Sequence, residues 1–185
     1  TKSSYVMNSI DHFIYERLSD IHDLSEDVVF TSDASLAKIQ KRLSIVQKHY
    51  PIYRSFSYFD TSRVRLIDTE NKGLGQQHSL SKYWKKLEKG HVVMDISKSE
   101  STGEIVMHFA CVVHNKKGQK IGYVVSRVLI DELYKVFGDV VSKSEIGNSI
   151  LIDLIDSDGT ILYSNNHPEL VLKATHPQLD VVNNY

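Results

Sequence analysis

The order of hydrophobic patterns along the chain predicts an α+β protein. Helix-type periodicity dominates the first fifty residues, and strand-like runs joined by short turns follow. The two most apolar runs, residues 105–113 and 121–130, flank a polar hinge that contains Gly118. Runs rich in Val and Ile around such a turn are typical of an antiparallel hairpin, with the glycine at positive φ. We therefore expect this hairpin in the middle of an antiparallel sheet.

The composition is ordinary for a globular protein with one sizeable core. Of 185 residues, 41% are apolar and 24% are charged. The 22 basic and 23 acidic side chains nearly cancel, which argues against a nucleic-acid partner bound through bulk charge. The single cysteine, Cys111, lies in an apolar run and is expected as a small core residue. No run of apolar residues is long enough to predict a membrane span, no signal peptide is visible, and the abrupt start favours an excised fragment.

Two amphipathic helices are expected before the first strand. The first covers residues 3–28 and is interrupted only by Arg17. Its stripe can dock on its own sheet, which base rates of helix burial favour, or on a second copy of the chain. The second helix covers residues 33–49, with a start signal at residues 31–33 and a stop at Pro51. The stripe of the first helix consists of Met7, Ile10, Ile14, Ile21, Leu24 and Val28.

The remainder of the chain reads as strands with short helical connections. A helix over residues 80–89 is expected to end at Gly90 in a left-handed cap, and a helical connection is expected to end at Gly138. In the first strand, Ser55, Ser57 and Phe59 share one face. The expected elements are strands over 52–59, 63–68, 91–96, 149–155 and 160–164, a loop over 69–77, turns over 60–62, 97–103 and 156–159, and short helices over 131–137 and 167–173.

Four pairs of phrases then occur in a characteristic order. They are residues 80–84 with 87–90, 95–97 with 101–104, 115–118 with 121–125, and 154–162 with 167–170. In order and spacing they resemble the extracytoplasmic Cache domain, the PAS-like (PDC) sensor module of membrane histidine kinases and chemoreceptors. The last phrase looks like the end of the membrane-distal half of a double Cache, so the chain is either a truncated double or a single-module variant.

The resemblance implies a PAS-like antiparallel sheet of five or six strands with the long N-terminal helix packed on one face. A ligand pocket lies on the other face, closed by the segment around residues 69–90. The implied organisation is N-terminal helices over 1–50, the sensor module over 51–173, and a C-terminal tail over 174–185 that leads towards a membrane segment.

The implied function is that of an extracytoplasmic ligand-sensing domain of a transmembrane receptor in signal transduction. A two-component sensor histidine kinase is the favoured parent, before a chemoreceptor or a cyclase. The expected partners are a small-molecule ligand and a second copy bound through the N-terminal helix. The rival interpretation is a structural or dimerisation module that responds to a partner protein, supported by the same helix stripe.

No catalytic role, cofactor or metal is expected for this fragment. The sequence has no Gly-x-Ser-x-Gly elbow and no phosphate loop, which leaves a small hydrolase as the third interpretation. The nine histidines show no metal-type pairing on a helix. The Asp-Ser-Asp-Gly sequence at 156–159 lacks the glutamate spacing of a calcium loop and reads better as a hairpin turn.

In the amino-acid-binding branch of the Cache family, a Tyr, an Arg, a Trp and a second Tyr hold the ligand carboxylate, and an Asp binds its ammonium. Carried over, Lys82 falls on the arginine, Trp84 on the tryptophan, Gln77 and Lys85 on the two tyrosines, and Arg127 near the aspartate. A cation then stands where an ammonium requires an anion, which disfavours an α-amino-acid ligand.

The same departures favour an anionic ligand such as a carboxylate or dicarboxylate. Lys82 and Arg127 are expected to converge on it, with His108 as a further donor. Trp84 and either Tyr58 or Tyr123 are expected to form apolar walls, and three more arginines are candidates if they point inward: Arg54, Arg63 and Arg65. Plainer interpretations are a core role for Trp84, a salt bridge from Arg127 to an aspartate, and a satisfied sheet histidine at 108.

Overall fold

The computed structural model describes residues 2–90, 92–98, 104–142, 153–155 and 161–164. The chain divides into two compact units, Thr1–Phe137 and Gly138–Tyr185. The helices are α1 (Lys2–Ser25), α2 (Val28–Thr31), α3 (Leu36–His49), α4 (Lys82–Lys89) and α5 (Ile130–Ser142). The strands are β1 (Ser55–Phe59), β2 (Arg65–Asp68), β3 (Val92–Lys98), β4 (Ile105–His114), β5 (Lys120–Leu129), β6 (Asp153–Ile155) and β7 (Ile161–Ser164).

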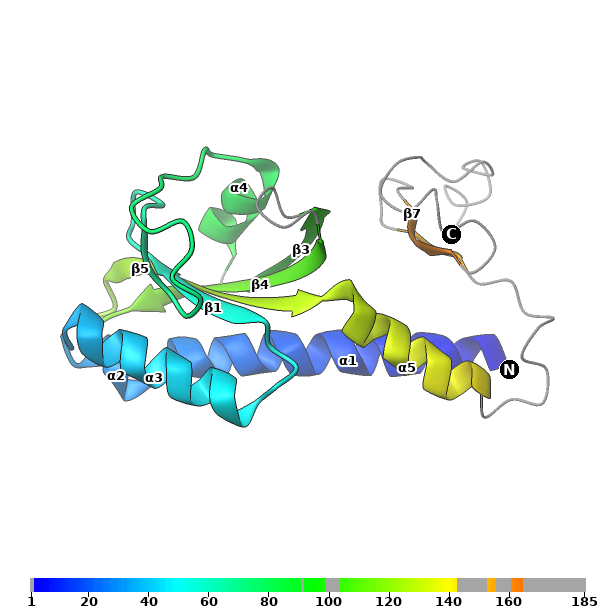
Figure 1. The fold of residues 1–185 in the computed structure, drawn as a ribbon. Coiled ribbons are helices and arrows are strands. Elements are labelled where there is room, and N and C mark those ends of the chain that lie inside the picture. Colours follow the sequence, from blue (N-terminus) through cyan, green and yellow to red (C-terminus); the bar gives the residue numbers. More distant parts are fainter. Residues whose placement is uncertain (1, 91, 99–103, 143–152, 156–160, 165–185) are drawn as a thin grey trace. The chain divides into compact units, whose positions relative to one another are not determined.

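Five strands of the first unit form one antiparallel sheet in the order β2-β1-β5-β4-β3 (Figure 1). The predicted hairpin is confirmed as β4 and β5, and it occupies the middle of the sheet. Gly118 lies in its turn at φ +75°, as expected. The predicted α+β fold with a PAS-like sheet is therefore confirmed.

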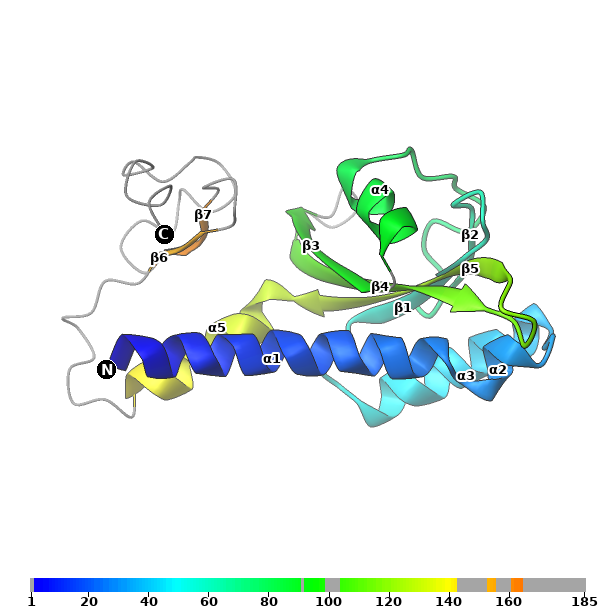
Figure 2. The ribbon, with the colours of Figure 1, turned by 180° about the vertical axis from the view of Figure 1, so that it is seen from behind.

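The helices cover the sheet on two sides. Figures 1 and 2 show α1 and α3 along one face and α4 on the other. Ile10, Phe13, Ile21 and Leu24 of α1 are buried, so its stripe docks on its own sheet. Val28 departs from the predicted stripe and is 69% exposed, because α1 ends at Ser25 and a separate short helix begins after Asp27.

Arg17, the interruption in the stripe, is accommodated within the first unit. Its Nη2 lies 3.1 Å from Oδ2 of Asp20, and its guanidinium lies 5.7 Å from the centre of the Tyr53 ring. The Tyr53 hydroxyl donates to the same carboxylate of Asp20. This cluster ties α1 to the segment that enters β1.

Three helix boundaries differ from the prediction. The second helix begins at Leu36, capped by the Ser35 side chain, because α2 already occupies the chain up to Thr31. Gly90 has φ −127°, not a left-handed conformation, because the chain continues directly in the extended direction of β3. α5 passes through Gly138 without a break.

The second unit contains an antiparallel pair, β6 with β7, which agrees with the predicted hairpin over these residues. The predicted turn over 156–159 and the short helix over 167–173 lie outside the described residues. Within the part of the chain that is described, no helix has the length and apolar character needed to cross a membrane.

Candidate functional site

The face of the sheet opposite α1 carries a cavity of about 890 Å³. All five strands of the sheet, the segment after β2 and α4 contribute to its wall. The lining residues include Ser55, Phe59, Arg65, Asp68, His78, Tyr83, Trp84, Asp95, His108, Val125 and Arg127. Its position matches the pocket that the resemblance implied.

Arg127 lies on the floor of this cavity. Its Nη1 donates to Ser57 Oγ (2.7 Å) and Ser55 Oγ (3.3 Å) on the neighbouring strand β1. The same nitrogen lies 3.5 Å from Oδ1 of Asp68. The two small serines leave room for the guanidinium over β1, on the cavity face of the sheet. Burial, together with the positive charge of Arg65, lowers the pKa of Arg127 to about 10.

Asp68 is almost fully buried and has several partners. Its Oδ1 accepts from Ser57 Oγ at 2.7 Å, and its Oδ2 accepts from the backbone N–H groups of Glu70 (3.1 Å) and Lys72 (2.9 Å). The carboxylate therefore shapes the turn after β2 while it offsets the charge of Arg127. The plainer interpretation of Arg127, a salt bridge to an aspartate, holds in this structure.

Arg65 reaches the cavity through an irregularity in β2. Ile67 pairs with Tyr58 and Arg65 pairs with Phe59, so one extra residue, Leu66, lies between the paired positions. Such a bulge turns the side chain on its far side, here that of Arg65, to the other face of the sheet. Arg65 thereby shares the cavity face with Asp68, and its guanidinium lies 5.3 Å from the centre of the Phe59 ring.

The guanidinium of Arg65 is only partly satisfied. Nη1 donates to the carbonyl of Lys72 at 3.0 Å, and Nη2 lies 3.3 Å from Nε2 of His78. Its Nε is buried and has no hydrogen-bond partner among the described residues. No carboxylate of the described residues lies within ion-pair distance of the guanidinium. Burial lowers the pKa of Arg65, although the charge of Asp68 opposes that effect.

Tyr83 on α4 supplies a second unsatisfied group. Its hydroxyl is buried and has no hydrogen-bond partner among the residues that the structure describes. Burial raises the pKa of this phenol, so it remains a hydrogen-bond donor. Its ring packs against Trp84, with centroids 5.5 Å apart. A buried donor without an acceptor is costly, and Tyr83 is one of the residues that line the cavity.

Two histidines complete the wall, one on β4 and one in the segment before α4. Burial and the neighbouring guanidinium groups of Arg65 and Arg127 lower the pKa of His78 to about 4 and that of His108 to about 3. Both imidazoles are therefore neutral near pH 7. Burial is the larger cause of both shifts, and the positive charges of the two guanidinium groups add to it.

The neutral state of His108 predicts an acid-sensitive fold. An unfolded histidine titrates near 6.5, whereas the folded state holds the pKa of His108 at about 3, so the unfolded chain binds more protons between these values. The free energy of unfolding therefore falls as the pH drops through this window.

We expect His108→Gln to flatten the decline of the melting temperature from about pH 7 to about pH 5. His49→Gln, at an exposed position of α3, is the matched control and should leave the decline unchanged. Parallel pH profiles for the wild type and His108→Gln would contradict this assignment.

The predicted site residues are placed as follows. Trp84, Arg127 and His108 line the cavity, and Trp84 also belongs to the core beneath α4, where it is only 3% exposed. Lys82 is the first residue of α4, and its side chain lies outside what the structure describes. Gln77 lines the cavity, and Lys85 is exposed on α4.

The expected tyrosine wall is not formed. Tyr58 points to the opposite face, where its ring packs 5.5 Å from that of Phe30, because side chains alternate along β1 and the cavity face belongs to Phe59. Tyr123 lies on the cavity side but is fully buried under Trp84, with ring centroids 5.1 Å apart. Neither residue lines the cavity.

Of the three further arginines, Arg54 and Arg65 reach the cavity. Arg54 lies at its exposed rim and pairs with Glu70 at 3.1 Å. Arg63 does not line the cavity: its Nε donates to the carbonyl of His78 at 3.0 Å. Sequence reasoning missed Tyr83 and His78, for which neither spacing nor periodicity gives a signal.

No family model matches the chain, and a search of curated proteins found no match. Solved structures match along most of its length. An extracellular ligand binding receptor from Desulfohalobium retbaense has 15% identity and a TM-score of 0.74, over 96% of this chain and 33% of that one. This chain therefore spans about a third of that receptor.

Two further matches are sensor domains named for their receptors. The ligand-binding domain of the Pseudomonas aeruginosa amino acid chemoreceptor PctC, in complex with GABA, has 15% identity and a TM-score of 0.70, over 94% of this chain and 77% of that one. The sensor domain of the V. cholerae histidine kinase DctB has 13% identity and a TM-score of 0.72, over 98% of this chain and 72% of that one. This chain has the fold of these sensor domains.

The predicted resemblance to Cache sensors is thus confirmed for the fold. At identities of 13–15%, the ligand must be argued from the residues of this chain. In the described part of the sensor fold, no group of three or more His, Cys, Asp or Glu side chains is arranged to hold a metal ion.

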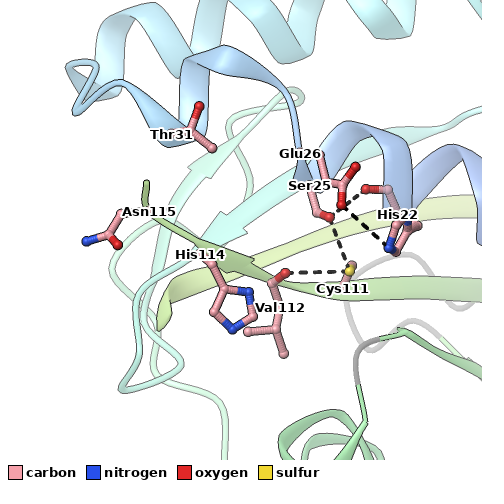
Figure 3. Close-up of a pocket in the computed structure, with 8 residues that line it drawn as sticks. All are labelled: His22, Ser25, Glu26, Thr31, Cys111, Val112, His114 and Asn115. Atoms are coloured by element: carbon pink, nitrogen blue, oxygen red, sulfur yellow. Dashed lines mark hydrogen bonds and ion pairs between the residues drawn. The ribbon is translucent and has the colours of Figure 1, made fainter. Parts of the chain in front are cut away.

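A second cavity, of about 390 Å³, lies beside the end of α1 (Figure 3). Its buried Cys111 Sγ donates to Ser25 Oγ at 3.3 Å, and Ser25 Oγ donates to the carbonyl of His22. His22 Nε2 lies 3.9 Å from Glu26. Neither of the two buried unsatisfied groups found in the described residues lies here. The candidate ligand site of the sensor fold is therefore the larger cavity.

Proposed function

We propose that this chain is the ligand-sensing module of a membrane signal-transduction receptor and that the larger cavity binds a small organic anion. The observation that carries the proposal is the pair of buried unsatisfied donors on the cavity wall, Arg65 Nε and the Tyr83 hydroxyl. A carboxylate that reaches both donors supplies the missing acceptors, and hydrogen bonds from a charged guanidinium to a carboxylate are among the strongest in proteins.

The charges of the lining support an anion rather than an α-amino acid. Each described carboxylate of the cavity already interacts with another group: Asp68 with Arg127, Glu70 with Arg54, and Asp95 and Glu104 with groups of their own. A ligand ammonium therefore finds no unengaged anion among them. Arg65, in contrast, is a half-buried cation with a buried Nε, and no described carboxylate contacts it as an ion pair.

The alternation of side chains along β4 suggests how binding reaches the rest of the receptor. His108 faces the cavity, whereas Cys111 faces α1 and contacts Ser25 there. A ligand held by β2 and α4 presses on strands whose opposite side carries α1. A shift of α1, or of a homodimer contact made through it, is then the signal that biases a two-state output.

We place the module outside the cytoplasm as part of a membrane-anchored protein, with a sensor histidine kinase as the favoured parent. The basis is the fold, which is that of sensor domains of a histidine kinase and a chemoreceptor. In this role the fragment binds and does not catalyse. The ligand class is a carboxylate or dicarboxylate, and Lys82 is retained as a further contact to be tested.

A thermal-shift titration of the 185-residue chain tests this function. The panel contains acetate, succinate, citrate and benzoate, each at a concentration near 100 times its Kd where solubility allows. A bound acid adds about 2.7 kcal/mol at that concentration, which raises the melting temperature by several degrees. We expect Arg65→Gln and Tyr83→Phe to remove most of the rise.

Arg54→Gln is the matched control, because Arg54 lies at the exposed rim and is already paired with carboxylates. It should keep most of the rise, and Lys82→Ala shows whether that lysine contributes. A rise that survives Arg65→Gln and Tyr83→Phe would put the acid elsewhere. If no acid raises the melting temperature, the result would contradict the sensing role and favour a structural or dimerisation module that responds to a partner protein.

A further inference from the structure

The larger cavity holds two imidazoles from separate segments, and each lies beside a guanidinium group. His108 is on β4, and His78 precedes α4. Arg127 on β5 is the guanidinium beside His108, and Arg65 on β2 is the one beside His78. Neutral imidazoles beside cations are a resting arrangement that changes when an anion enters and cancels the positive charge.

The surroundings of His108 are fixed by the register of the sheet. Arg127 on β5 is its cross-strand partner on one side, and Asp95 on β3 is its partner on the other. Its Nδ1 lies 3.4 Å from Ser97 Oγ, and the ring of Tyr83 on α4 stands 6.4 Å away. His108 therefore has a cation, an engaged acid and an unsatisfied phenol as neighbours, and the charges of Arg65 and His78 also act on it.

His78 is held by the arginines of the β2 segment. Its Nε2 lies 3.3 Å from Arg65 Nη2, and because arginine only donates, Nε2 is the acceptor and Nδ1 carries the proton. The backbone of His78 is tied to Arg63, whose guanidinium lies 3.9 Å from Glu88 on α4. The ring of Phe59 packs edge-on against the imidazole at 4.9 Å.

We propose that the cavity takes up a proton together with its anion and that His78 and His108 are the groups that accept it. This inference rests on the proposed anion site. The proton comes from the solvent and forms a bond to an imidazole nitrogen. At His78 that nitrogen is Nε2, so protonation breaks the hydrogen bond from Arg65 Nη2 and releases this donor for the anion.

The electrostatics act in the same direction. Arg65 and Arg127 both help to lower the pKa of each histidine, and an anion between them removes part of that effect. The pKa values of the histidines then rise towards their ordinary range on binding. Linkage requires the reverse as well: binding strengthens as the pH falls, by up to about tenfold per pH unit for each proton taken up.

The test measures protons directly. Isothermal titration calorimetry near pH 6 is run with the panel acid that gives the largest thermal shift, in buffers of different ionisation enthalpy. The slope of apparent enthalpy against ionisation enthalpy gives the protons taken up. We expect a clear uptake in the wild type, a smaller one in His78→Gln and His108→Gln, and an unchanged one in His49→Gln.

A second measurement needs no ligand. Arg65→Gln removes the charge that the anion cancels, so an NMR titration of the imidazole signals should show a higher pKa for His78 than in the wild type. Binding without proton uptake, or a His78 pKa that stays fixed in Arg65→Gln, would overturn this inference and leave the anion site standing. Failure of every acid to bind would overturn the anion site itself.

Discussion

Replacing Gly122 with alanine is expected to lower the free energy of unfolding by about 3 kcal/mol, near the upper end of overpacking effects. A Cβ at this position would lie 2.3 Å from the carbonyl oxygen of Phe59 and 2.8 Å from the hydroxyl of Tyr58. Neither neighbour yields easily, because β1 is hydrogen-bonded to β5 and the Tyr58 hydroxyl donates to the carbonyl of Ile121. Urea denaturation followed by circular dichroism measures the loss.

Gly138→Ala is the matched control for the same chemical change. Gly138 lies in α5, and a Cβ there would meet nothing within 4 Å. Alanine in a helix interior is favoured over glycine by up to about 1 kcal/mol, so this variant should be neutral or slightly stabilised. Equal losses for the two variants would contradict the close approach of β1 and β5 at Gly122.

Periodicity predicted well the elements whose own sequence carries the whole apolar pattern that is buried. The hairpin of β4 and β5 was predictable because both runs are apolar enough to be central, and α1 because its stripe repeats over several turns. Gly90 shows the limit. A glycine after a helix predicts a left-handed cap, but the following strand decides the direction of the chain.

The candidate site depends on features that no local pattern carries. Arg127 was predicted, but its partner Asp68 comes from a strand two positions away in the sheet. The serines of β1 that accept from Arg127 were predicted to share a face, but not to contact an arginine. Arg65 reaches the cavity because of the extra residue Leu66, which reverses the facing that alternation alone predicts. The importance of Tyr83 follows from its buried, unsatisfied hydroxyl, which only coordinates reveal.

Two glycines in the segment after β2 allow a sharper test of Arg65 than removal of the side chain itself. Gly73 and Gly75 have φ values of +63° and +77°, so alanine is strained at both positions to a similar degree, by about 1 kcal/mol. A Cβ at Gly73 would lie 2.5 Å from Nη1 of Arg65, whereas a Cβ at Gly75 would meet nothing within 4 Å.

Gly73→Ala is therefore expected to displace the guanidinium of Arg65 from the carbonyl of Lys72 and from the anion, because that end of a flexible side chain is what yields. Loss of a hydrogen bond to a charged group costs about 1.5–3 kcal/mol, so the affinity for the panel acid should fall roughly ten- to hundredfold. Gly75→Ala should bind as the wild type does, and without ligand both variants should lose thermal stability through the positive φ, with a further loss in Gly73→Ala from the displaced hydrogen bond to Lys72. Equal affinities in calorimetric titrations would show that the anion does not depend on the position of Arg65, and a drop confined to Gly73→Ala would identify this guanidinium as the group that holds it.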